Sequence, residues 1–254
     1  PEKLAEYKAS FLGHFPNGKA FDHSDYLKQE RAYKAELVDE FQNRFSKHFP
    51  NLPPADAELI ALAEGLFRLF TQPLDSNGGN PQNLVGWRYS NFARLLDDEA
   101  KISFVRAVGA LLDDSAALGA RIQSFQSELR RLATQVGENV GAAMKRSVAS
   151  FFLFLSDPAE YVFVKTREYK RSMNDLLGAH CLGAADEYEQ ILGFTKAVKQ
   201  DLIEDGWQPQ DLIDVQSFLW VHHMQKKPQA SDHDRVVPIR VLRIDPDELG
   251  DAVA

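Results

Sequence analysis

The sequence predicts a mainly α-helical, multi-helix globular domain with a minor β contribution. Apolar residues recur at the helical spacing of about 3.6 residues through most of the chain. Proline and glycine clusters separate these segments, and only two short stretches carry a β-like pattern. With 254 residues, of which 44% are apolar, the chain can bury a substantial core.

The N-terminal part is expected to form helices over 4–11, 24–48 and 55–70. Prolines in the segment 49–54 break the second helix, and Gln72–Pro73 stops the third. A loop rich in asparagine and glycine follows over 75–83.

Further helices are expected over 89–96, 99–112, 118–134, 141–155, 166–177, 186–204 and 209–224. The last of them is the most informative. Asp211 can cap it, and the spacing of Leu212, Val215, Leu219 and His222 places them on one helix face. This pattern predicts a core helix rather than a catalytic loop.

The β contribution is expected at two places. The run Tyr161–Val164 is either a strand or a buried loop, and 236–244 alternates as a short C-terminal strand does. A polar linker over 225–234 precedes that second stretch. We therefore expect a helical recognition module over 1–224, and a linker and strand over 225–254 that lead to a downstream domain. Since Pro1 is not an initiator methionine, we expect the chain to be a module of a longer protein or a processed chain.

Composition narrows the function classes. The single cysteine, Cys181, permits no internal disulfide and no cysteine-based zinc site, which fits a cytoplasmic protein. The sequence contains no apolar run long enough for a membrane span. It also lacks a phosphate-binding loop with its lysine, so we expect no NTPase activity and no cofactor.

The net charge of −8 is unevenly distributed. Residues 121–171 carry nine basic and five acidic side chains, whereas 172–254 carry seven and fifteen. A localised basic patch on an acidic chain is typical of a phosphate contact surface. The patch predicts a nucleic-acid site made of Lys145, Arg146, Lys165, Arg167, Tyr169, Lys170 and Arg171.

Aromatic residues accompany this basic patch. A flat ring can stack on an unpaired base, as we expect of Tyr169 and of the phenylalanines at 151, 152 and 154. The alternative is that these phenylalanines belong to the core and that the cations only form the solvent-exposed surface of a helix. A second aromatic cluster, Trp87, Arg88 and Tyr89, either forms a recognition pocket or packs inside.

Two catalytic or metal-binding arrangements are weaker alternatives. Asp157, Glu168 and Lys170 have the loose spacing of a metal-dependent nuclease, although Asp157 before a proline also suits a turn. His222 and His223 point about a hundred degrees apart on a helix, so they cannot both face one ion. We expect a partly buried His222, a surface His223 and no metal site.

Three motifs carry a resemblance to a known family. Glu30–Lys34, the run 154–158 followed by 161–165, and the run 211–221 occur in this order. Over 20–224 the chain resembles the helical module ahead of the AAA+ motor in McrB-type restriction and anti-phage proteins of bacteria. The resemblance implies a non-catalytic module that recognises a target, often nucleic acid, while a separate motor or effector subunit or domain cuts that target. A scaffold that binds a partner subunit or a phage protein through an acidic surface is the alternative.

Overall fold

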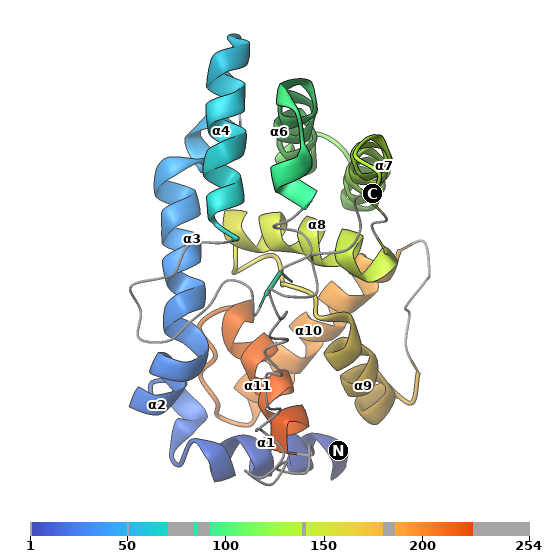
Figure 1. Cartoon of the computed structure of the whole chain (residues 1–254). Helices are drawn as coiled ribbons and strands as arrows, with labels where there is room; N and C mark the ends of the chain where they lie inside the picture. The colour runs from blue at the N-terminus through green and yellow to red at the C-terminus, as the bar shows by residue number, and fades with distance from the viewer. Residues whose placement is uncertain are drawn as a thin grey trace, which may run out of the picture.

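The computed structural model describes residues 2–49, 51–70, 84–85, 92–138, 141–179 and 186–225. Within these residues the protein is mainly helical and contains no strand, which confirms the predicted fold class (Figure 1). The α-helices with given bounds are α1 Glu2–His14, α2 Ser24–Tyr26, α3 Ala32–Arg44, α4 Asp56–Arg68, α6 Asp98–Leu112, α7 Leu118–Gln135, α8 Ala142–Ser156, α9 Thr166–Leu177, α10 Glu187–Glu204 and α11 Leu212–Gln225. None of the described helices combines the length and apolar character that a bilayer span requires.

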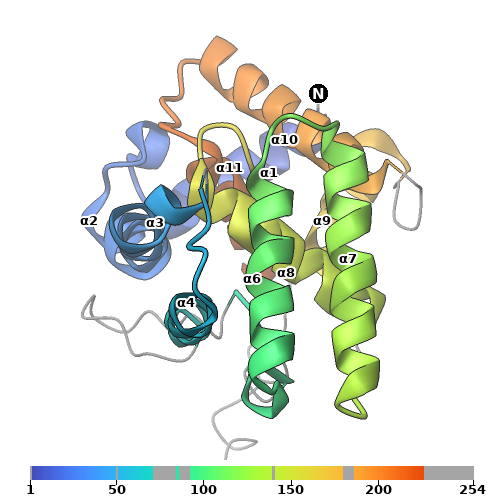
Figure 2. The same cartoon turned by 90° about the horizontal axis from the view of Figure 1, so that it is seen from above.

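Helix α8 lies across the middle of the molecule and separates two groups of helices (Figure 1). Helices α4, α6 and α7 lie on one side of α8, and α6 and α7 run side by side (Figure 2). Helices α1, α9, α10 and α11 lie on the other side, while α3 runs along both groups. Each group has its own apolar core.

The phenylalanines of α8 belong to the first core. Phe151, Phe152 and Phe154 are buried, and Phe152 contacts the rings of Phe104 and Phe125 from α6 and α7. These rings are therefore unable to stack on a base, and the core alternative is correct for them.

Helix α11 is the central helix of the second core, as its apolar spacing predicts. Leu212, Val215 and Leu219 are all buried. Asp211 caps the helix, because its Oδ1 accepts a hydrogen bond of 2.9 Å from the Ile213 amide. The expectation of a surface His223 is wrong, since this residue is only 4% exposed. Helix α11 is covered on almost every side, which its apolar stripe alone does not indicate.

The run Tyr161–Val164 is a buried extended loop rather than a strand. Side chains form hydrogen bonds with its backbone groups. The Tyr188 hydroxyl donates to Val162 O at 3.0 Å, and Ser150 Oγ accepts from Val164 N at 3.0 Å. Phe163 packs in the first core, whereas Val162 and Val164 pack in the second. The alternation along this run therefore comes from a segment that passes between two cores.

The predicted long helix over 24–48 contains two irregular turns. A π-helical turn, Leu27–Arg31, joins α2 to α3, and a 3-10 turn, Ser46–His48, follows α3. The π turn lies where charged side chains reach α11. Arg31 donates to both Asp211 and Asp214, and Lys34 donates to Gln216 and Ser217 at 2.8 and 2.7 Å. The segments Glu30–Lys34 and 211–221 thus form one polar network.

A candidate anion-binding cavity

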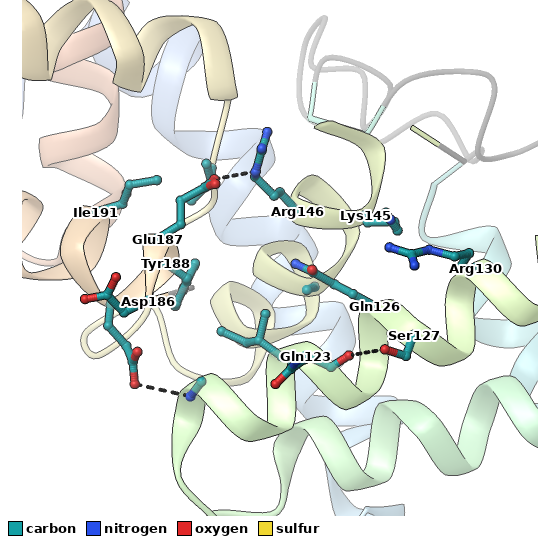
Figure 3. Close-up of a pocket in the computed structure, with 15 residues that line it drawn as sticks. Gln123, Gln126, Ser127, Arg130, Lys145, Arg146, Asp186, Glu187, Tyr188 and Ile191 are labelled. Carbon is teal, nitrogen blue, oxygen red and sulfur yellow. Dashed lines mark hydrogen bonds and ion pairs between the residues drawn. The ribbon is translucent and has the colours of Figure 1, made fainter. Parts of the chain in front are cut away.

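A cavity of about 430 Å³ lies between α7, the N-terminal end of α8 and the start of α10 (Figure 3). Val164, in the loop that leads into α9, also contributes to its wall. Cationic side chains stand on one side and carboxylates on the other. The polar lining residues that matter for its chemistry are Gln123, Gln126, Arg130, Lys145, Arg146, Asp186, Glu187 and Glu189.

Lys145 is the most unusual residue of the cavity. It is only 8% exposed, and within the described part of the chain its ammonium group has no hydrogen bond or ion pair. Burial lowers the pKa of Lys145, and the positive charges of Arg130 and Arg146 lower it further. In Figure 3 the ends of the Arg130 and Lys145 side chains lie close together. The cavity is therefore lined by an ammonium group that has no acidic partner in the described residues and is repelled by two neighbouring cations.

The carboxylates on the opposite side already have partners. Glu187 forms an ion pair with Arg146, and Glu189 Oε1 accepts a hydrogen bond of 3.2 Å from the Gly119 amide. Asp186 Oδ1 accepts from Gln190 Nε2 at 2.7 Å. None of these contacts involves Lys145 or Arg130, so these two cations remain available to an anion.

Helix α7 lines the cavity with a polar face. Gln123, Gln126, Ser127 and Arg130 follow one another at helical spacing, which places them on one side of the helix. An adjoining face carries Phe125 and Leu129 into the first core, and Ile122 both joins that core and lines the cavity. The amides of Gln123 and Gln126 can therefore donate hydrogen bonds to a ligand that the two cations attract.

The structure divides the predicted nucleic-acid site into two parts. Lys145 and Arg146 line the cavity, whereas Arg167, Lys170 and Arg171 are exposed on one face of α9. No ion pair involves these three α9 cations within the described residues. Helices α8 and α9 are in contact, so both parts belong to the same region of the molecule.

Tyr169 of α9 and Lys165, which directly precedes that helix, have other environments. Tyr169 is 2% exposed and packs in the second core with Met173, because both lie on the inward face of α9. It cannot stack on a base, and its assignment to the nucleic-acid site is wrong. The Lys165 ammonium lies 4.2 Å from the centroid of the Trp220 ring, a cation–π contact.

The nuclease and metal arrangements find little support in the geometry. Asp157 Oδ1 accepts from the amides of Ala159 and Glu160, as the turn alternative predicts. Among the described residues no group of three or more histidines, cysteines or carboxylates could hold a metal ion. His223 Nε2 instead lies 2.9 Å from Ser172 Oγ and 3.2 Å from the Tyr7 hydroxyl. The cluster of Trp87, Arg88 and Tyr89 lies outside the described residues.

Sequence reasoning missed Arg130 and the polar face of α7. Arg130 belongs to the basic segment 121–171, and that charge asymmetry was the available signal. The cavity itself combines residues from three helices, so no single spacing could reveal it. No protein-family model, no curated protein and no solved structure matches this chain.

Proposed function

We propose that this chain is a non-catalytic target-recognition module that binds nucleic acid. The contact surface consists of the exposed α9 cations together with Arg130 and Lys145 of the cavity. The resemblance to McrB-type proteins would place such a module in bacterial restriction or anti-phage defence, beside a motor or effector subunit.

One observation carries the proposal. Cations without an acidic partner in the described part of the chain gather on α7, α8 and α9, although the chain as a whole has a net charge of −8. Arg167, Lys170 and Arg171 are exposed on one helix face, where they can contact successive phosphates. An anionic polymer would be attracted to this region and repelled by the acidic remainder, which orients its approach.

Fluorescence anisotropy with labelled single-stranded and double-stranded oligonucleotides tests the proposal. The α9 variant Arg167→Gln/Lys170→Gln/Arg171→Gln should bind weakly, and the slope of log K against log salt should fall by about 2–3. The control Lys28→Gln/Lys47→Gln/Arg106→Gln removes the same charge from exposed positions elsewhere and should bind as wild type does. Equal affinities of the wild type and the α9 variant at low salt would exclude this surface.

The non-catalytic part of the proposal has a separate test. Metal-dependent hydrolysis needs carboxylates that hold a cation, and Asp157 is engaged in a turn. Purified protein with magnesium or manganese should leave DNA and RNA intact. Cleavage that disappears in both Asp157→Ala and Glu168→Ala would instead establish the nuclease alternative.

A further inference from the structure

The cavity between α7, α8 and α10 has features that a general phosphate-contact surface does not need. A surface of that kind uses exposed cations, as on α9, whereas Lys145 is nine-tenths buried. Placing an ammonium group without an acidic partner beside two other cations is unfavourable, so such a residue is expected where a ligand supplies the missing negative charge. Lys145 also lies near the N-terminal end of α8, where the helix dipole favours an anion.

A second cation completes the charge of the site. Arg130 reaches the cavity from α7, and its guanidinium faces the Lys145 ammonium (Figure 3). Arg146 is held by Glu187, so it does not add an equivalent free charge. The anionic group of the ligand should therefore lie against Arg130 and Lys145, on the side away from Asp186 and Glu189, and can carry up to two negative charges.

The volume of the cavity and its other lining residues indicate what the rest of the ligand is. A cavity of about 430 Å³ is in the range of small-molecule sites and can hold one nucleotide-sized group. Gln123 and Gln126 offer donors beside the cations, while Asp186 and Glu189 offer acceptors on the opposite side.

We propose that this cavity binds a terminal phosphomonoester, with Arg130 and Lys145 on the phosphate and the carboxylate side facing hydroxyl or amino groups. A phosphomonoester carries about −1.5 to −2 charges at neutral pH, which matches the two cations, whereas each internal diester of a nucleic acid carries only one. The source is either the phosphorylated end of a nucleic acid or a free mononucleotide. The nucleic-acid source rests on the proposed function.

The experiment compares one labelled single-stranded oligonucleotide with and without a 5′-phosphate. Wild type should bind the phosphorylated form about ten-fold more tightly, as expected for charge-assisted hydrogen bonds to one added group. Lys145→Met and Arg130→Gln should both lose this preference. Arg131→Gln is the matched control, because Arg131 is the next residue on α7 and pairs with Glu128. If Lys145→Met does not fold, the Arg130→Gln variant alone tests the preference for the phosphorylated strand, because Arg130 is exposed.

Competition and thermal shift separate the two sources. Adenosine monophosphate and inorganic phosphate should displace the phosphorylated strand and raise the melting temperature of wild type more than that of Arg130→Gln. Stabilisation by these probes without any oligonucleotide binding would retain the phosphate pocket and overturn the nucleic-acid function. Equal affinity for both strand ends, with a salt dependence that the α9 variant reduces, would overturn the pocket and retain the function. Absence of every phosphate effect would also overturn the pocket.

Discussion

Lys145 differs from an ordinary surface lysine because its side chain is largely covered and its charge lies beside two other cations. Arg146, the next residue of α8, forms an ion pair with Glu187. Lys145 forms none within the described residues, and its pKa lies below the usual 10.5 for this reason. A residue that weakens the fold and yet lines a cavity is a candidate for function rather than for stability.

Replacing Lys145 by methionine should stabilise the unliganded protein by about 1 kcal/mol, since methionine fills a similar volume without the charge. The lysine binds fewer protons in the folded state than in the unfolded chain. Wild-type stability should therefore rise as pH increases toward 10.5, and the advantage of Lys145→Met should narrow. Urea unfolding at neutral and alkaline pH measures both effects. A variant that is less stable than wild type throughout would contradict this account.

His223 is the residue for which the sequence was most misleading. Its polar side chain suggested solvent exposure, but it lies between α1 and α9 and contacts the hydroxyls of Tyr7 and Ser172. A polar residue on a helix that is buried on nearly all sides needs such partners. The polarity of His223 is therefore satisfied inside the protein.

His223→Ala should lower the free energy of unfolding by about 2–3 kcal/mol, because it leaves a cavity and removes a partner from two buried hydroxyls. The exposed His14 provides the control, and His14→Ala should change stability by less than about 0.5 kcal/mol. Chemical denaturation measures both variants. If His223→Ala unfolds at the same denaturant concentration as wild type, the buried position of His223 is incorrect.

At the scale of elements, the contact between the π turn and α11 holds together segments far apart in the sequence. Asp214 is fully buried and accepts hydrogen bonds from Tyr26, Arg31 and the Gln210 amide. Asp211 receives two further bonds from Arg31 at 2.9 and 2.8 Å. The pair of carboxylates thus fixes the start of α11 against the junction of α2 and α3.

Asp214→Ala should cost about 3–5 kcal/mol of stability, because it leaves the partly buried Arg31 and the buried Tyr26 without this acceptor. Asp211→Ala should cost less, since Asp211 is partly exposed and Arg31 would keep its bond to Asp214. Thermal or denaturant unfolding ranks the two variants. The reverse order would show that the outer carboxylate, rather than the inner one, anchors the helix.

The elements themselves were largely predictable from sequence, whereas their environment was not. The helix over 166–177 matches α9, and that over 118–134 ends within one residue of α7, because helical spacing and breakers are local signals. The burial of Tyr169 and His223 depends on which helices cover them, which is not local. The same reason hides the cavity, where Arg130 and Lys145 meet only through the packing of α7 against α8.

At the scale of the whole molecule, two apolar cores share a few residues that pass between them. Phe163 lies in the first core, and its neighbours Val162 and Val164 lie in the second. Helix α11 behaves similarly, with Ile213 in the first core and Leu212 in the second. Tyr188 packs against both cores. Loss of either core would therefore expose residues that stabilise the other.

This coupling predicts that the two cores unfold together. Thermal unfolding should show one transition, with the calorimetric enthalpy equal to the van't Hoff enthalpy and the same midpoint by circular dichroism. Phe163→Ala should lower that midpoint by removing a large buried side chain, at a cost of about 3–5 kcal/mol, and should keep the transition single. The exposed Leu177→Ala is the control and should melt close to wild type. Two separate transitions in wild type would mean that the residues between the cores do not couple them, and the phosphate cavity would then belong to a unit that unfolds on its own.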